Sequence, residues 1–259
     1  MIRNWFGLAQ NEFTRNTIIG KILRLPLRVL PSNMQVPILS GKLRGKKWII
    51  DSGIHRYWLG TYELEKQERF TQMVSPEDIV FDIGANVGFY SLLASMLVGD
   101  LGRVISFEPV KRNINYLRQH LAINQIENVT VMEVAVSDRD GLASFDPSPE
   151  ASMGHFSEAG AEQVQTVSID RLIELNQLPL PQVMKIDIEG AEMLALIGAQ
   201  NTINHNHPII FLATHGEIVH RSSCKLLISW GYSLTPLDTT DLNQAREVLA
   251  IHHSQQPKL

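Results

Sequence analysis

Short apolar runs alternate with segments of helical periodicity along most of the chain. Runs with the length and the β-branched or aromatic content of buried strands lie at 79–81, 104–107, 129–136, 164–169, 183–187 and 209–212. Apolar residues recur at helical spacing at 63–73, 91–98, 111–123, 170–175, 189–197 and 218–230, and a weaker strand pair is expected near Ser233 and Val248. This alternation predicts an α/β fold around a mostly parallel sheet.

A glycine-spaced turn follows the first of these strands. Asp82 closes the apolar run, Gly84 and Gly88 flank Asn86, and the helical pattern at 91–98 begins soon afterwards. Glycine lacks a Cβ, so such a turn can adopt positive φ and its backbone can approach a ligand, which the first N–H groups of the next helix then face. The turn therefore predicts a binding site, and a tight connection without a ligand is the alternative.

A second acid, Glu108, ends the strand at 104–107. It lies roughly twenty residues past the turn, the offset at which a carboxylate can accept both ribose hydroxyls of a nucleotide. A dinucleotide fingerprint would need a third glycine where this chain has Phe89, which argues against NAD(P) and leaves an oxidoreductase as a less favoured function. The alternative for Glu108 is a first-turn carboxylate in front of the helix that begins at Pro109.

The strand at 129–136 ends in small and polar residues. Val136 is placed to form an apolar wall for an adenine ring, while Ser137 or Asp138 meets the edge of the ring; for Asp138 a simple turn is an equal alternative. The segment 141–160 is rich in Gly, Ser, Pro and Ala, which predicts strand pieces joined by a loop over the site.

Two further strands end in or near residues that can act as acids or bases. Asp187 ends the run at 183–187 on the same strand face as Lys185, and His215 follows the run at 209–212. Because ligands bind outside the carboxyl ends of strands in open α/β sheets, we expect Gly84, Glu108, Asp187 and His215 to converge on one site.

The first part of the chain is expected to form an extension, residues 1–62, in front of a main domain at 63–259. Apolar and basic residues at 17–30 favour an amphipathic helix, kinked by Pro26, that docks on the core or on a partner subunit; contact with a membrane surface is the alternative. A short hairpin is expected over 43–63, leading into the helix at 63–73. Its aromatic residues Trp48, Tyr57, Trp58 and Tyr62 are expected to cover a sheet edge rather than to line a pocket mouth.

Composition narrows the class of protein. The 259 residues are 44% hydrophobic, enough for one domain with a full core, and the net charge of −4 offers no basic footprint for nucleic acid. Cys224 is the only cysteine, so no intramolecular disulfide can form and a reducing compartment such as the cytoplasm is expected. No apolar run approaches the length of a membrane span, and residues 1–30 lack the order of a signal peptide.

Several blocks together resemble the FkbM-type methyltransferases, a class I family that acts through S-adenosylmethionine. The resemblance covers about residues 60–232 and rests on Gly-Thr-Tyr-Glu at 60–63, Phe-Asp-Ile-Gly-Ala-Asn-Val-Gly at 81–88, Phe-Glu-Pro at 107–109, Ala-Val-Ser-Asp at 135–138 and Lys-Ile-Asp-Ile-Glu-Gly-Ala-Glu at 185–192. It implies a Rossmann-like, seven-stranded sheet with helices on both faces and a final antiparallel strand. It also implies methyl transfer, usually to an oxygen of a sugar, polyketide or similar small molecule.

On this resemblance, the donor would be bound by residues at the strand ends: Asp82, Gly84, Asn86, Gly88, Glu108, Val136 and Asp187. Many members of the family carry a glutamate near the end of the fifth strand, where this chain has Ala213-Thr214-His215. A cofactor-binding scaffold protein without catalytic activity is therefore a further alternative.

For the chemistry, Asp187 is suited by position and His215 by its ordinary pKa to remove the proton of an acceptor hydroxyl. Polar turn and helix-start roles are the alternatives for His215 and for the acids that follow Asp187. Asp187, Glu189 and Glu192 match no metal-ligand signature, so no metal is expected.

Overall fold

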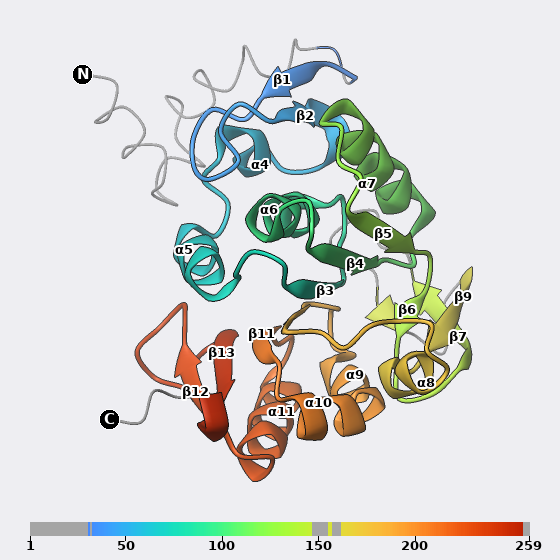
Figure 1. Cartoon of the computed structure of the whole chain (residues 1–259), viewed down its shortest axis with the longest axis vertical. Helices are drawn as coiled ribbons and strands as arrows, with labels where there is room; N and C mark the ends of the chain where they lie inside the picture. Colours follow the sequence, from blue (N-terminus) through green and yellow to red (C-terminus); the bar gives the residue numbers. More distant parts are fainter. Residues whose placement is uncertain (1–30, 32, 147–154, 157–161, 256–259) are drawn as a thin grey trace.

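A seven-stranded sheet forms the centre of the computed structural model, which describes residues 31, 33–146, 155–156 and 162–255 (Figure 1). Its strands are β3 (Ile79–Ile83), β4 (Arg103–Phe107), β5 (Val129–Met132), β10 (Val183–Ile186), β11 (Ile209–Ala213), β12 (Tyr232–Pro236) and β13 (Glu247–His252). They lie in the order β12-β13-β11-β10-β3-β4-β5, and β13 runs antiparallel to both of its neighbours while the remaining pairs are parallel. The predicted sheet, including its antiparallel strand, is confirmed.

Helices cover both faces of the sheet, as predicted (Figure 1). One face carries α5 (Leu64–Met73), α6 (Phe89–Val98) and α7 (Lys111–Ile123), and the other carries α8 (Ile169–Glu174), α9 (Glu192–Gly198), α10 (Gln200–Asn206) and α11 (Glu217–Ser229). The helix expected at 189–197 begins only at Glu192, because Glu189 and Gly190 both have positive φ angles, 53° and 101°.

Alternate residues of the central strands enter two separate hydrophobic cores. On β3, Val80 packs into the core beneath α6, whereas Phe81 and Ile83 pack into the core beneath α9 and α11. On β11, Phe211 joins the first core and Leu212 the second. Because both faces are buried, these strands read as continuous apolar runs in the sequence.

The chain changes direction within the sheet between β3 and β10. From β3 it winds outward to β4 and β5, and it later returns to β10, which pairs with the opposite edge of β3. The connections after these two strands therefore leave in opposite directions, which opens a crevice at the carboxyl ends of the strands.

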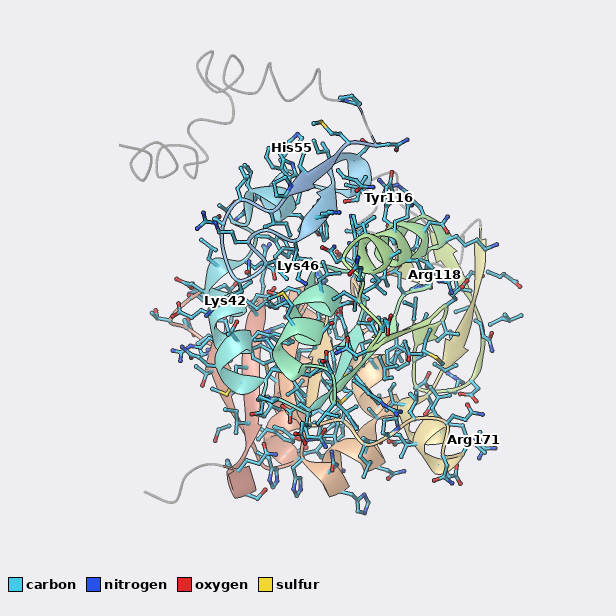
Figure 2. All side chains as sticks on the ribbon, turned by 45° about the horizontal axis from the view of Figure 1, so that its top comes forward. Lys42, Lys46, His55, Tyr116, Arg118 and Arg171 are labelled. Atoms are coloured by element: carbon cyan, nitrogen blue, oxygen red, sulfur yellow. The ribbon has the colours of Figure 1, made fainter. Side chains whose placement is uncertain are left out.

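The single strand expected at 129–136 is wrong, because this run is divided between two sheets. β5 belongs to the main sheet, whereas β6 (Ala135–Val136) pairs with β9 (Glu162–Val167) in a second sheet with β7 (Gly141–Asp146) and β8 (His155–Phe156). Between them, Glu133 forms an ion pair at 2.6 Å with Arg118. Figure 2 labels Arg118. The expected strand pieces at 141–160 are present; residues 147–154 and 157–161 lie outside the described part.

The hairpin expected over 43–63 is also wrong in its pairing. β1 (Gln35–Pro37) pairs antiparallel with β2 (Lys47–Ile49), and the aromatic stretch after them forms a short helix, α4 (Arg56–Leu59). Gly60 ends α4 in the left-handed conformation, with φ of 73°, and a Cβ there would lie 1.9 Å from the Ser40 carbonyl oxygen. The chain is thus held against the preceding loop and cannot continue as a strand.

The described part of the extension shares the core of the main sheet. Trp48 is fully buried and stacks on His120 of α7 with ring centroids 3.7 Å apart. His120 also accepts a hydrogen bond from Ile49 N and bonds through Nδ1 to the Val87 carbonyl oxygen. The helix expected at 17–30 lies outside the described residues, within which no helix is long and apolar enough to cross a membrane.

Candidate functional site

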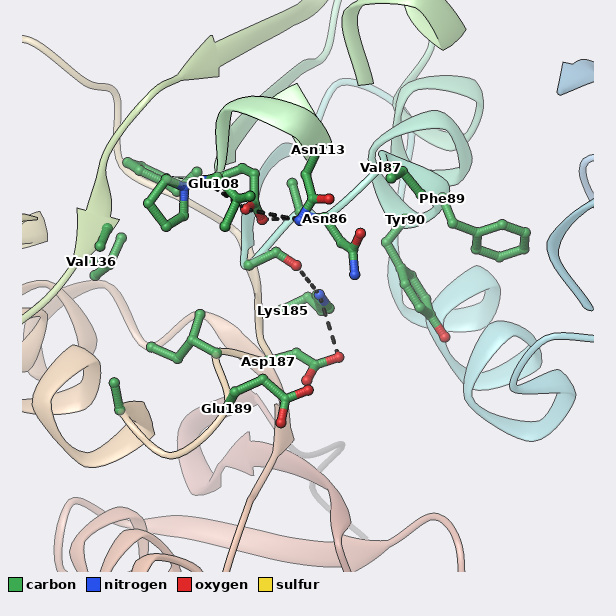
Figure 3. A pocket seen from close by; sticks show the side chains of 18 of the residues that line it. Asn86, Val87, Phe89, Tyr90, Glu108, Asn113, Val136, Lys185, Asp187 and Glu189 are labelled. Atoms are coloured by element: carbon green, nitrogen blue, oxygen red, sulfur yellow. Dashed lines mark hydrogen bonds and ion pairs between the residues drawn. The ribbon is translucent and has the colours of Figure 1, made fainter. Parts of the chain in front are cut away.

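A cavity of about 210 Å³ opens at the crevice between the carboxyl ends of β3 and β10 (Figure 3). The residues Gly84, Glu108, Asp187 and His215, expected to converge, all line it. One side, which we call the turn side, is lined by Gly84, Ala85, Asn86, Glu108 and Val136. The opposite side, the acidic side, is lined by Glu63, Asp187, Glu189, His215 and Glu247.

The glycine turn depends on residues without side-chain bulk. Gly84 has φ of +78°, and a Cβ there would lie 1.9 Å from the backbone oxygen of Asp187. The N–H groups of Gly84 and Ala85 both donate to the carbonyl oxygen of Phe107 at 3.0 Å, which ties the turn to β4. Gly88 serves packing instead: it does not line the cavity, and its Cβ would lie 2.3 Å from Leu117 Cδ1.

A buried row of polar side chains lies beneath the turn. Lys185, Asp82 and Ser106 occupy paired positions on adjacent strands β10, β3 and β4. Lys185 Nζ lies 3.3 Å from Asp82 Oδ1 and donates to the Gly84 carbonyl oxygen at 2.8 Å, while Ser91 of α6 donates to Asp82 Oδ2 at 2.7 Å. Asp82 does not line the cavity. It positions Lys185 and α6, and through them the turn.

Glu108 anchors the turn from the next strand. Its Oε2 accepts from Asn86 N at 2.8 Å, and its Oε1 accepts from Val110 N at 2.9 Å and from Asn113 Nδ2 at 3.2 Å (Figure 3). Burial raises the pKa of Glu108 above its usual value, although these three donors oppose the shift. The carboxylate is thus held rigidly at the rim of the cavity, where a lone pair can still accept from a ligand hydroxyl.

The wall beyond Glu108 is apolar. Val134, Ala135 and Val136 line the cavity and are almost completely buried. Ser137 and Asp138, expected at the edge of an adenine ring, are not among the lining residues; their side chains bond to each other, with Ser137 Oγ 3.2 Å from Asp138 Oδ1.

Asp187 stands where the two sides of the cavity meet. Its Oδ2 lies 3.6 Å from Lys185 Nζ and 3.9 Å from Lys66 Nζ, and its Oδ1 lies 3.8 Å from His215 Nε2. Burial alone would raise the pKa of Asp187, but Lys185, Lys66 and His215 together outweigh it, so the pKa is lowered. Asp187 is consequently a stable carboxylate.

His215 faces carboxylates through both ring nitrogens. Nδ1 lies 2.7 Å from Oε1 of the fully buried Glu192, and Nε2 lies 3.4 Å from Glu189 Oε2 and 3.8 Å from Asp187 Oδ1. The hydrogen bond to Glu192, with the charges of Glu189 and Asp187, raises the pKa of His215 although burial opposes it. The carboxylates thus shift the ring toward its imidazolium form, in which both nitrogens are donors.

Sequence reasoning gave no role to three residues that build the acidic side. Lys66, only 3% exposed, lies 2.7 Å from Glu247 Oε2 and 3.3 Å from Glu63 Oε2, and Glu63 accepts a hydrogen bond from Tyr90 Oη at 2.9 Å. Glu63 closes the block at 60–63 that supported the family resemblance, so a signal for it existed. Lys66 and Glu247 stand in no motif, and only the fold brings them together.

In the part of the chain that the structure describes, no group of three or more His, Cys, Asp or Glu side chains is arranged to hold a metal ion. The acidic side is instead organised by lysine and histidine cations.

Known proteins match a large part of this sequence. The family model described as "Methyltransferase FkbM domain" matches residues 82–244. Hexuronic acid methyltransferase AglP of Haloferax volcanii is 29% identical over 153 residues, which cover 58% of this chain and 62% of AglP. The chain therefore matches less than two thirds of the length of that relative.

Solved structures with a similar chain path are more distant in sequence. Methyltransferase FkbM from Methylobacillus flagellatus KT is 19% identical with a TM-score of 0.49, and the alignment covers 77% of this chain and 56% of that one. Aeropyrum pernix fibrillarin, solved with natively bound S-adenosyl-L-methionine, is 13% identical with a TM-score of 0.41 and coverages of 69% and 68%.

Proposed function

The chain belongs to the methyltransferase FkbM family, and on that premise we propose that it transfers a methyl group from S-adenosylmethionine to a hydroxyl of a sugar or similar small molecule. The observation that carries this proposal is the joint placement of the glycine turn, Glu108 and Asp187 around one cavity. A cavity with an apolar wall and a few fixed polar groups is suited to a nucleoside with its ribose and amino acid parts.

The turn side suits the donor. Glu108 would accept hydrogen bonds from the ribose hydroxyls, Val136 would contact the adenine ring, and the backbone at Gly84 and Asn86 would approach the amino acid part closely. The missing Cβ of Gly84 lets the turn pack directly against the Asp187 backbone, which brings the donor-binding turn and Asp187 together. When bound, S-adenosylmethionine supplies an electrophilic methyl group on a positively charged sulfur.

The charge balance of the cavity favours such a cation. Glu63, Glu108, Asp187, Glu189 and Glu247 line it, against the lining cations Lys185 and His215 and with Lys66 buried behind them. A site with this excess of carboxylates attracts a sulfonium.

The acidic side suits the acceptor. Tyr57, Tyr62, Phe89 and Tyr90 line the cavity next to Glu63, and aromatic faces beside carboxylates suit a sugar ring with its hydroxyls. The name of the Haloferax volcanii relative, a hexuronic acid methyltransferase, supports a sugar acceptor. We assign Asp187 to the junction of donor and acceptor, and His215 to a hydrogen bond that orients the acceptor.

The proposal extends to the surroundings of the protein. We place it in a reducing compartment such as the cytoplasm, because Cys224 is the only cysteine and is buried as a free thiol. Nucleic acid is not expected as a partner, since the net charge is −4. Residues 1–62 are assigned to an extension, in which 17–30 would contact the core, a second copy or a membrane surface.

Transfer of tritium from labelled S-adenosylmethionine into fractions of a cell extract tests this function. We expect label in a sugar or small-molecule fraction, and S-adenosylhomocysteine should bind in a calorimetric titration. Label that enters only protein or nucleic acid would contradict the small-molecule acceptor. Binding of S-adenosylhomocysteine without transfer to any fraction would instead support a scaffold protein.

A further inference from the structure

Glu247 reaches the cavity because its strand runs against the others. β13 is antiparallel to β11, so its first residue lies at the carboxyl ends of the parallel strands, directly opposite Ala213. The carboxylate lines the cavity from there and is 19% exposed. It therefore stands at the same edge as Asp187 and His215 without being part of the strand ends that the sequence pattern marks.

One carboxylate oxygen of Glu247 is held by a cation, and two further acids lie nearby. Lys66 of α5 holds Oε2 at 2.7 Å, while Glu63 and Asp187 add negative charge and the Tyr90 ring lies 5.3 Å from Lys66 Nζ. Burial, together with Glu63 and Asp187, raises the pKa of Glu247 to about 7, although Lys66 lowers it. Near neutral pH this group can both take up and release a proton.

His215 and Asp187, the two residues expected from the sequence to remove this proton, are less suited. Both nitrogens of His215 face carboxylates, which raise the pKa of the ring, so it is better suited to donate hydrogen bonds than to take a hydroxyl proton. Asp187 interacts with Lys185, Lys66 and His215, and these cations lower its pKa and weaken it as a base.

We infer that Glu247 is the catalytic base that takes the proton of the acceptor hydroxyl, with Lys66 as its positioning residue. This inference rests on the proposed function. In the balanced step, the acceptor oxygen bonds to the methyl carbon and the carbon–sulfur bond breaks, leaving its electron pair on a neutral thioether. The hydroxyl proton passes to the carboxylate oxygen of Glu247 that Lys66 does not hold, and from there to solvent.

The test compares Glu247→Gln with Glu174→Gln, which makes the same chemical change at an exposed carboxylate that does not line the cavity. Three quantities are measured: transfer of tritium from S-adenosylmethionine to the extract fraction that wild-type protein labels, its pH profile, and the affinity for S-adenosylhomocysteine. We expect Glu247→Gln to lower turnover by roughly 10²–10⁴-fold and to abolish the rise of the rate with pH around neutrality. Glu174→Gln should keep the wild-type turnover and that rise.

An NMR titration of the side-chain carboxyl groups gives a readout that needs no turnover. A carboxyl group should titrate near neutral pH in wild-type protein and be missing in Glu247→Gln, while the affinity for S-adenosylhomocysteine stays within about threefold. Turnover of Glu247→Gln at the wild-type rate, with an unchanged pH profile, would overturn the inference and leave the proposed function intact. If wild-type protein labels no fraction, the proposed function fails and the inference fails with it.

Discussion

The turn side and the acidic side of the cavity are held together by different physics. On the turn side, the Glu108 carboxylate accepts from backbone N–H groups and from Asn113, and the turn itself donates to the backbone of β4. On the acidic side, Glu63, Asp187 and Glu247 come from distant parts of the chain and meet around the buried Lys66. Backbone geometry defines the first side, and a balance of charges defines the second.

This difference predicts how each side responds to change. A backbone-defined site tolerates the loss of a distant charge but not the addition of an atom where the chain folds back on itself. A charge-balanced site tolerates small changes of shape, but removal of one ion leaves its partners buried and unpaired.

Removal of Lys66 should have the largest effect on stability. Lys66→Met leaves Glu63 and Glu247, which are 23% and 19% exposed, without their shared cation. We expect a loss of about 3 kcal/mol in the free energy of unfolding, measured by urea denaturation near neutral pH. The control Arg171→Met breaks an ion pair whose partners are 50% and 69% exposed and should cost less than about 1 kcal/mol. Equal losses in the two variants would show that the acidic side is not balanced by Lys66.

On the turn side, the corresponding test is the addition of a methyl group at Gly84. Gly84→Ala places a Cβ 1.9 Å from the Asp187 backbone oxygen, and we expect a loss of about 2–4 kcal/mol together with weaker binding of S-adenosylhomocysteine. Gly45→Ala is a matched control, because its φ of +88° is similar but no atom lies within 4 Å of the new Cβ. It should lose only the backbone cost of about 1–2 kcal/mol and keep full binding. Similar losses of binding in both variants would show that the close packing of Gly84 on the Asp187 backbone does not support ligand binding.

Acid should weaken the attachment of the turn through His120. Burial lowers the pKa of His120 from 6.5 to about 4, although the hydrogen bond to Val87 opposes it. The unfolded chain thus binds the proton first as the pH falls, so this contribution is complete above pH 6.5 and is lost as the pH falls toward 4. The loss amounts to at most about 3 kcal/mol. Urea denaturation at about pH 7 and about pH 5 should show a steeper decline for wild type than for His120→Gln; parallel declines would be inconsistent with a neutral, buried His120.

The same contrast explains what the sequence could predict. Gly84, Asn86 and Glu108 lie close together in the sequence, and their spacing after apolar runs carries the geometry of the turn. Lys66 and Glu247 are separated by most of the chain, and their pairing depends on β13 running antiparallel, which places its first residue at the carboxyl ends of the other strands. No local pattern marks such a residue.

The two wrong strand predictions also arose where contacts between distant parts of the chain decide the structure. The apolar run at 129–136 has one continuous pattern, yet Val136 pairs with Val167 in the second sheet because that partner is supplied by a strand thirty residues further along the chain. At 56–59 the aromatic residues fit a strand by propensity, but the left-handed Gly60 packed on Ser40 ends a short helix there. In both places tertiary contacts overrode local preference.

The division of the cavity into a donor side and an acceptor side is tested most directly by calorimetric titration of S-adenosylhomocysteine into two isosteric variants, Glu108→Gln and Glu247→Gln. Each change replaces one cavity-lining carboxyl group by an amide of the same shape. The account predicts that Glu108→Gln loses about 1.5–3 kcal/mol of binding free energy, the worth of a charge-assisted hydrogen bond, whereas Glu247→Gln loses less than about 0.5 kcal/mol. Equal losses in both variants, or a larger loss in Glu247→Gln, would contradict it.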